Sequence, residues 1–260
     1  MHFKRIAVAA IVLPLLYLYI MFLDRNWFFF LMAIISVIAI LEFYSMYKVY
    51  GLIKYTGIVS CIFITVAATF YPKEIISAIV ISVMAIMIIR LLFKKTPLYS
   101  LQDISAPVMG IIYIPCFISF QIQLREISPV WIIFLYTTVW SADSLAYYIG
   151  KSFGKTKLYR EISPNKTVAG AWGSVSGGIL GSLLIKYTLL ASISIYNAIV
   201  AGIIIGTVTI IGDLVESMFK RDTGVKDSGI LIPGHGGILD KLDGALFAGP
   251  VLYWIVRQIS

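Results

Sequence analysis

Long apolar runs are the feature that most constrains the fold of this chain. Several windows of about 20 residues carry almost no charge, and this is the length that an α-helix needs to cross a bilayer. With 60% hydrophobic residues, 13% charged residues and a mean hydropathy of +0.93, a soluble domain would expose too much apolar surface to water. The sequence therefore predicts an all-α, polytopic integral membrane protein.

About nine transmembrane helices are expected, within a single polytopic membrane domain over residues 1–260. Residues 1–103 hold N-terminal helices, and residues 104–260 hold helices together with polar loops that carry the expected catalytic site. The expected spans cover residues 5–23, 27–47, 53–71, 74–93, 104–124, 129–149, 170–189, 193–211 and 243–258.

The basic residues between the spans predict how the chain crosses the membrane. If the N-terminus is cytoplasmic, 16 of the 21 Lys and Arg residues fall on the cytoplasmic side. The other side then holds only Arg25, Lys73, Arg125, Lys186 and Arg257. Since cytoplasmic loops carry an excess of basic residues, this asymmetry favours an N-terminus inside the cell. The net charge of +8 is then mainly a topology signal, and no nucleic-acid partner is expected.

Two polar segments interrupt the apolar pattern in the C-terminal half. The first runs from Trp140 to Gly173, begins near Asp143, and continues through glycines, hydroxyls and clustered bases that end in Lys166. An ionised carboxylate such as Asp143 at the end of a span needs a partner or a wet cavity. The bases suit phosphate binding, but the positive-inside asymmetry alone also explains them.

The second polar segment, Gly212 to Asp243, holds six of the 13 acidic residues. If the preceding helix continues through it, Asp213, Glu216, Ser217 and Lys220 share one face at spacings of three, four and seven residues. Further along, Asp240 and Asp243 lie one turn apart at the start of a new helix.

A glycine-rich turn joins these two acidic helix faces. It reads Pro-Gly-His-Gly-Gly over residues 233–237, and its N–H groups are suited to an anion. Two acidic faces around such a turn predict a site for a divalent cation and a polyphosphate, because Mg²⁺ uses few carboxylates and keeps phosphate oxygens and waters as ligands. The alternative is a set of solvated interfacial salt bridges.

A family resemblance rests on these same residues. The segment SMFKRDTGVKDSGILIPGHGGILDKLD resembles the signature of phosphatidate cytidylyltransferases, also called CDP-diacylglycerol synthases. The matching residues are Ser217, Lys220, Arg221, Lys226, Asp227, Gly229, Pro233, His235, Gly236, Gly237, Asp240 and Asp243. The similarity continues in WSADSLAYYIGKSFGKTKL and in the first apolar run, so it covers essentially the whole chain, and it is closest to the bacterial type.

The resemblance implies a reaction and a set of roles. CTP and phosphatidic acid would give CDP-diacylglycerol and pyrophosphate, with Mg²⁺ as cofactor and a second cation left open. The enzyme would lie in the plasma or inner membrane and would form a homodimer, and the charge asymmetry places its active site on the cytoplasmic face. The expected catalytic residues are Asp213, Asp240, Asp243, Lys226 and His235. The expected metal ligands are Asp213, Asp240, Asp243, Glu216 and Asp143. The expected phosphate-binding residues are Lys166, Ser217, Lys220, Arg221, Lys226, Gly236 and Gly237.

Two positions depart from the family pattern, and two other functions stay open. Lys241 stands where the family usually has Arg, and Ala169 stands where it commonly has Glu, so no acid role transfers to Ala169. A CTP-using lipid-alcohol kinase shares related motifs with this family. A transporter with ion-binding acids is less compatible, because transporters place such acids near mid-span and here they cluster at one membrane face.

Overall fold

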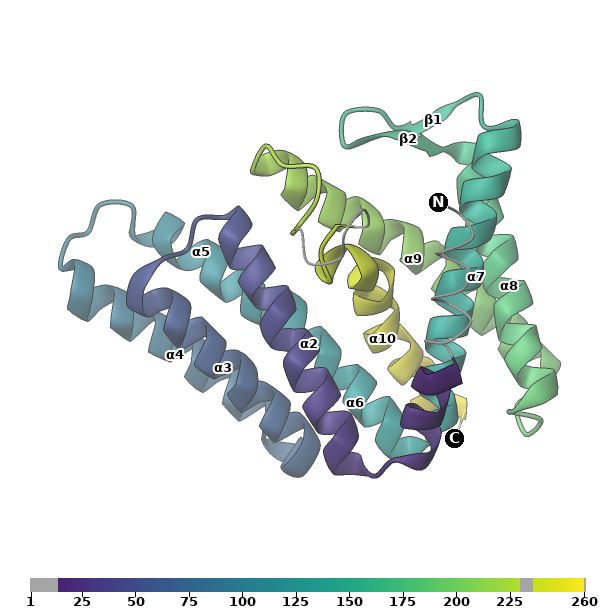
Figure 1. The fold of residues 1–260 in the computed structure, drawn as a ribbon, viewed down its shortest axis with the longest axis horizontal. Helices are drawn as coiled ribbons and strands as arrows, with labels where there is room; N and C mark the ends of the chain where they lie inside the picture. The colour runs from purple at the N-terminus through teal and green to yellow at the C-terminus, as the bar shows by residue number, and fades with distance from the viewer. Residues whose placement is uncertain (1–13, 230–235, 260) are drawn as a thin grey trace.

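The computed structural model describes residues 14–229 and 236–259, and these are almost entirely helical (Figure 1). Residues 14–22 form a helix that precedes α2. The labelled helices are α2 (Arg25–Met46), α3 (Gly51–Phe70), α4 (Ile75–Lys94), α5 (Ser100–Ile111), α6 (Phe117–Ile127), α7 (Pro129–Phe153), α8 (Val168–Thr188), α9 (Ile195–Asp222) and α10 (Leu239–Ile259). A short 3₁₀ turn, Pro72–Glu74, precedes α4, and a π-helical segment, Ile112–Cys116, joins α5 to α6.

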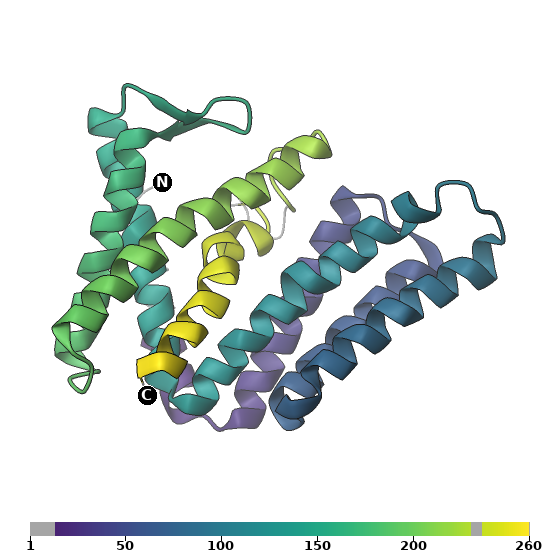
Figure 2. The same cartoon turned by 180° about the vertical axis from the view of Figure 1, so that it is seen from behind.

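Two groups of helices lie on either side of α10. In Figure 1, α2 to α6 form one group and α7 to α9 form the other. Helix α10 packs against α9 on one side and against α6 on the other, which Figure 2 shows from behind. The start of α10 is therefore the place where residues from both halves of the chain can meet.

Six helices have the length and apolar composition to cross a membrane within the described residues. They are Arg25–Met46, Gly51–Phe70, Pro72–Lys94, Ser100–Ile127, Val168–Thr188 and Ile195–Asp222. The prediction of an all-α integral membrane protein is thus confirmed, whereas the count of nine and the orientation stay predictions. Helices α7 and α10 are also long, but α7 contains Asp143 with several hydroxyls, and α10 begins with two acids. The span expected at 5–23 begins outside the described residues.

Helix α8 packs against its two neighbours through glycines. A Cβ added at Gly177 would lie 2.3 Å from the carbonyl oxygen of Ser141 in α7. A Cβ at Gly178 would lie 2.2 Å from the carbonyl oxygen of Gly202 in α9. Small residues allow such close backbone approach, which is how helices associate in lipid without a hydrophobic driving force between them. The glycines of α8 therefore hold α7 and α9 close together.

The substitution Gly178→Val is expected to destabilise the protein. Its new side chain would meet a backbone carbonyl, which cannot rotate away, and overpacking of this kind costs about 1–3 kcal/mol. The thermal unfolding midpoint in detergent should fall clearly below that of the wild type. Ser176→Val places the same side chain on the exposed face of α8 and is the matched control. Equal midpoints for the two variants would contradict this packing role.

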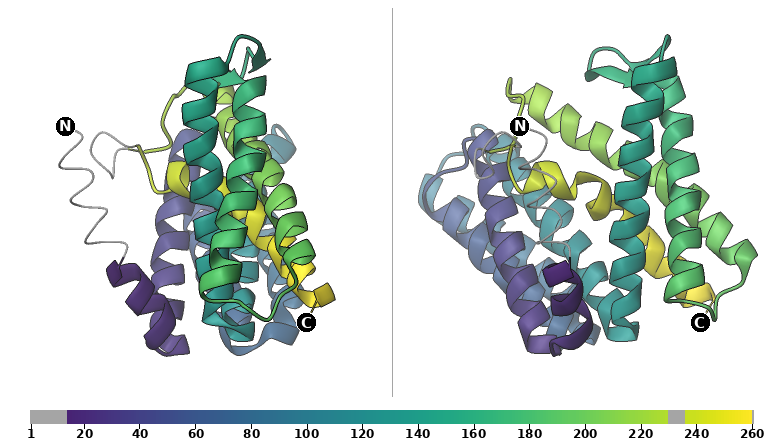
Figure 3. Two further views of the ribbon diagram at one scale, coloured as in Figure 1. Left: turned by 90° about the vertical axis from the view of Figure 1, so that its right-hand side faces the viewer. Right: turned by 45° about the vertical axis from the view of Figure 1, so that its right-hand side comes forward.

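A small hairpin and several helix ends lie at one end of the molecule. The strands β1 (Lys157–Tyr159) and β2 (Ser163–Thr167) pair antiparallel between α7 and α8, an element that the all-α prediction did not include. The side views in Figure 3 place this hairpin toward the same end as the last turns of α9 and the start of α10. Both polar segments of the sequence therefore come together at one end of the helical framework.

Candidate active site

Helix α9 carries the first part of the candidate site on its last turns. The helix continues through Gly212 to Asp222, as the spacing of its polar residues predicted. The Ser217 hydroxyl donates to Asp213 Oδ1 at 3.4 Å, and Lys220 Nζ lies 3.1 Å from Glu216 Oε2. The Glu216 side chain is fully buried, and its Oε1 has no hydrogen-bond partner among the described residues. The predicted polar face therefore exists, with its deepest carboxylate held by Lys220.

The first turns of α10 bring the second acidic pair against this face. Lys220 Nζ lies 2.5 Å from Asp240 Oδ1, so one ammonium joins carboxylates of both helices. The helices approach closely because Gly212 has no side chain: a Cβ there would lie 2.5 Å from the carbonyl oxygen of Asp243. The acidic faces of α9 and α10 therefore lie against each other, as expected from the sequence.

Asp240 is held by more donors than any other acid in this region of the described chain. Its Oδ2 accepts hydrogen bonds from the Ser228 N–H at 2.9 Å, the Ser228 hydroxyl at 2.9 Å and the Gly237 N–H at 2.7 Å, while Oδ1 contacts Lys220. Asp240 stands in the first turn of α10, before the apolar part of that helix begins. Burial alone would raise its pKa, but these donors outweigh burial and hold the pKa below its usual range. Asp240 is therefore a fixed anion that organises the site.

The β-hairpin supplies a cation from the other polar segment. Lys166 in β2 places its Nζ 2.6 Å from Asp213 Oδ2. Thr167 then caps α8, because its hydroxyl oxygen accepts the Gly170 N–H at 3.1 Å. The hairpin thus presents Lys166 toward α9, and the two polar segments form one site.

A polar cavity of about 780 Å³ lies between α7, the hairpin, α9 and α10. Six of the expected site residues line it: Asp143, Lys166, Asp213, Lys220, Asp240 and Asp243. Gly150, Gly154, Ser163 and Asn165 line the hairpin side. Ammonium groups and hydroxyls can bind phosphate oxygens, and carboxylates can hold the divalent cation that accompanies a polyphosphate, so a cavity of this size with both can take a nucleotide polyphosphate.

Other expected site residues lie outside the lining of this cavity. Arg221 donates instead to the carbonyl oxygens of Ile162 and Val225, at 3.2 and 3.0 Å, and so ties the hairpin to the end of α9. Lys226 is exposed. The Gly237 N–H is already bound to Asp240 at 2.7 Å, and Gly236 beside it adopts a positive φ of 84°. His235 lies outside the described residues.

The acidic side chains of this cavity determine whether a divalent cation fits there. Among residues 14–229 and 236–259, no three His, Cys, Asp or Glu side chains converge closely enough to hold a metal ion by themselves. Mg²⁺ does not need such a set, because it usually takes one or two carboxylates and completes its shell with phosphate oxygens and waters. Asp143, Asp213 and Asp243 on the wall of one cavity, and the unpartnered Glu216 oxygen beside it, fit that mode of binding.

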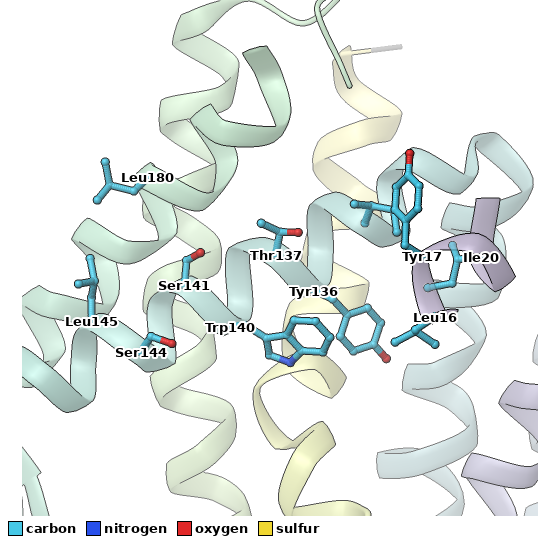
Figure 4. A pocket seen from close by; sticks show the side chains of 11 residues that line it. Leu16, Tyr17, Ile20, Tyr136, Thr137, Trp140, Ser141, Ser144, Leu145 and Leu180 are labelled. Atoms are coloured by element: carbon cyan, nitrogen blue, oxygen red, sulfur yellow. The ribbon is translucent and has the colours of Figure 1, made fainter. Parts of the chain in front are cut away.

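One apolar cavity adjoins the polar one, and a second apolar cavity adjoins the first. The nearer, of about 480 Å³, shares Asp143, Asp240 and Asp243 with the polar cavity and also contacts Lys241. The farther, of about 560 Å³, shares Leu16, Ile20, Tyr136 and Trp140 with the nearer one. Figure 4 shows this farther cavity, with aliphatic and aromatic side chains from the helix of residues 14–22 and from α7 facing one another. An apolar path thus leads to the carboxylates from the side of the helices.

One polar residue at this site was not predicted from the sequence. Glu42 of α2 accepts hydrogen bonds from Ser228, Ile238 and Leu239, at the base of the turn that joins α9 to α10. Its partners lie at least 186 residues away in the chain. The available signal was the acid itself, since a carboxylate within an apolar run of 22 residues is costly and marks a functional site by default.

The chain resembles known proteins along almost its whole length. The sequence model of the cytidylyltransferase family matches residues 3–259. The chain belongs to this family. Phosphatidate cytidylyltransferase of Bacillus subtilis (strain 168) is 33% identical over 198 residues, which are 74% of this chain and 73% of that protein. The enzyme of that name from Synechocystis sp. is 46% identical over 124 residues, 48% of this chain and 42% of that protein. The one from Staphylococcus saprophyticus is 38% identical over 165 residues, 62% of each chain.

Membership of the cytidylyltransferase family confirms the resemblance that the glycine and acid motifs indicated. It also gives the polar cavity a chemical context, because each of these three relatives is named phosphatidate cytidylyltransferase. The roles of individual residues are not given by these matches and follow from the geometry above.

Proposed function

We propose that the protein is a phosphatidate cytidylyltransferase, which transfers the CMP moiety of CTP to phosphatidic acid and releases pyrophosphate. The observation that carries this proposal is the meeting of a polar and an apolar cavity at Asp143, Asp240 and Asp243. A soluble polyphosphate and the acyl chains of a lipid require opposite surroundings, so the two substrates would react where these surroundings join. The family and its named relatives agree with this substrate pair.

The chemistry needs positioning more than it needs a base. A lipid phosphate oxygen attacks the α-phosphorus of CTP, a new P–O–P bond forms, and the bond to the β-phosphate breaks. The second pKa of a phosphate monoester is about 6, so the nucleophile is already ionised near pH 7. The protein must instead hold two polyanions in line and neutralise the leaving pyrophosphate.

The cavity residues divide this work between them. Lys166 and Lys220 stand on the polar cavity and would contact phosphate oxygens, giving up part of their present pairing with Asp213 and Asp240. Asp213 and Asp243, supported by Asp143 and Glu216, would hold Mg²⁺. When bound, Mg²⁺ would neutralise charge on the phosphates during transfer. Whether a second cation takes part stays open.

The lipid would approach through the apolar cavities. Leu16, Ile20 and Trp140 border the path that leads from the farther cavity to the acids, and Lys241 stands exposed where the path meets them. Acyl chains would stay among these apolar side chains while the phosphate reaches the junction. A basic residue at position 241 suits an anionic headgroup, so the Lys that replaces the usual Arg keeps the needed charge.

The protein would lie in the plasma or inner membrane, and its site would face the cytoplasm. The excess of Lys and Arg on the expected cytoplasmic side of the membrane supports this orientation. The nucleotide is also supplied from the cytoplasm. This orientation can be tested with Glu161→Cys in the hairpin, in a background without Cys61 and Cys116. We expect a membrane-impermeant reagent to label this cysteine in inverted vesicles and not in right-side-out vesicles. That the protein is a homodimer stays a prediction, which sedimentation of the purified protein in detergent would test.

Labelled CTP separates this function from that of a lipid-alcohol kinase. Purified protein in detergent is incubated with Mg²⁺, phosphatidic acid, a lipid alcohol such as diacylglycerol, and CTP that carries label either in the cytosine ring or in the γ-phosphate. We expect lipid-soluble product with the cytosine label and pyrophosphate with the γ-label. Transfer of the γ-label to a lipid alcohol, with cytosine left in CDP, would identify a kinase instead.

A further inference from the structure

Glu42 connects the N-terminal helices to the start of α10. It is the only acidic residue of α2, yet both of its carboxylate oxygens are engaged by the other end of the chain. Oε1 accepts the Ile238 N–H at 3.0 Å, and Oε2 accepts the Leu239 N–H at 2.9 Å. The Ser228 hydroxyl lies 3.1 Å from Oε2. One side chain of α2 thus contacts both described ends of the turn between α9 and α10.

These contacts satisfy the first free donors of α10. The N–H groups at the start of a helix have no partner within the helix, and the helix dipole places positive potential there. A carboxylate is therefore the group that best satisfies them. In α10 this carboxylate comes from a different helix, so the position of α10 along its own axis depends on α2.

Glu42 and Asp240 share Ser228 as a contact. The Ser228 hydroxyl lies 3.1 Å from the Glu42 carboxylate and 2.9 Å from the Asp240 carboxylate, although it has one proton to donate. Asp240 also binds the N–H groups of Ser228 and Gly237. The two carboxylates therefore close the base of the turn together, and the orientation of Asp240 depends on the position of its neighbour.

The space around Glu42 is closed by two glycines. A Cβ added at Gly229 would lie 2.7 Å from Glu42 Oε1, and one added at Gly237 would lie 2.3 Å from Oε2. No other residue type fits at these positions while the carboxylate stays in place. The chain thus approaches Glu42 closely from both ends of the turn.

We propose that Glu42 is a positioning residue for the transfer reaction: it fixes the start of α10 and so sets the places of Asp240 and Asp243 at the junction of the two cavities. The proposal rests on the function proposed above. Glu42 itself is not among the residues that line the polar cavity. It acts through the N–H groups of Ile238 and Leu239, and through Ser228.

The test compares turnover with CTP binding in Glu42→Gln. The amide keeps the size of the side chain, but its NH₂ group faces donors and leaves at least one of them unpaired. We expect kcat per folded enzyme to fall about 10- to 100-fold, the usual effect of losing a partner that orients a site carboxylate. CTP affinity, measured directly by binding, should change by less than about threefold, because Lys166 and the hairpin do not contact Glu42. Glu126→Gln, an exposed glutamate paired with Arg25 at the opposite end, is the control and should match the wild type.

A second variant leaves Glu42 intact and tests the same contact. Gly229→Ala, whose added Cβ would meet only the Glu42 side chain, should displace the carboxylate and give the same pattern, with lower kcat and nearly unchanged CTP binding. Combining it with Glu42→Gln should add little further loss, because both changes remove one interaction. If Glu42→Gln does not fold, Gly229→Ala alone must show the pattern.

The outcomes separate the two proposals. No cytidylyl transfer by the wild-type protein would overturn the proposed function. Transfer by the wild type, with full kcat in Glu42→Gln or in Gly229→Ala, would overturn the role of Glu42. If the number of CTP-binding sites per protein and the turnover fall equally in both variants, the role of Glu42 is also overturned, because unfolding alone gives that result. Multiplying losses in the double variant would show that Glu42 does not act through this contact.

Discussion

Asp243→Asn and Asp213→Asn are each expected to lower turnover by at least about 100-fold while the protein stays folded, as loss of one key electrostatic stabiliser does elsewhere. Both carboxylates line the polar cavity, and Asp243 also borders the apolar path. The amide keeps the shape of the side chain, and its oxygen can still accept the Gly244 N–H that Asp243 Oδ1 accepts at 2.7 Å. What is lost is the negative charge that would hold Mg²⁺ against the phosphates.

The measurement is kcat for cytidylyl transfer in detergent, with the Mg²⁺ concentration varied. Glu161→Gln removes the charge of an exposed acid in the hairpin and should leave kcat unchanged. Near-normal turnover of both Asp variants at low Mg²⁺ would remove these carboxylates from the metal site. Recovery of activity at high Mg²⁺ would support their role, because weakened binding can be offset by concentration.

Asp240 belongs to the same acidic cluster but is expected to behave differently. Four donors bind its two oxygens, so an Asn there would place its NH₂ group against Lys220 or against the N–H groups of Ser228 and Gly237. The loss would therefore combine local unfolding of the turn with lower turnover. The sequence grouped Asp240 with Asp213 and Asp243 as equal ligands. All three line the cavity, and only the contacts show that the oxygens of Asp240 are already occupied by donors.

The helices could be predicted because apolar windows are a local property of the chain. The span expected at 27–47 is α2, Arg25–Met46, and the one expected at 53–71 is α3, Gly51–Phe70. The continuation of α9 to Asp222 also followed from local spacing. By contrast, the π-helical segment Ile112–Cys116 arises around Pro115, which lacks an N–H, and hydropathy contains no sign of such a change in winding.

The site was predictable in its residue types and not in its pairings. Acids, bases and glycines at helical spacing indicated a phosphate and metal site, and six of the expected residues do line one cavity. The partners across the site depend on how distant helices pack, so Lys166 with Asp213 and Glu42 with Leu239 had no local pattern to reveal them. Arg221 shows the same limit, since its guanidinium is bound to the carbonyl oxygens of Ile162 and Val225 and not directed into the cavity.

Lys220→Met is expected to have the largest effect on stability. Lys220 is the one cation that contacts both Glu216 and Asp240 among the described residues, and the Glu216 side chain has no exposure to solvent. Removing the ammonium leaves the buried Glu216 carboxylate and the half-buried Asp240 carboxylate without a counter-charge, and breaking a buried pair in this way costs about 3–5 kcal/mol. The thermal midpoint in detergent should fall by more than in Gly178→Val.

The same variant can be rescued if this electrostatic account is right. Adding Glu216→Gln to Lys220→Met removes one of the two unpaired charges, so the double variant should unfold at a higher temperature than Lys220→Met alone. Lys155→Met, which removes an exposed lysine near the end of α7, is the matched control and should keep the wild-type midpoint. If the double variant is no more stable than Lys220→Met, the loss comes from packing of the lysine chain, and the ammonium does not hold α9 and α10 together through Glu216.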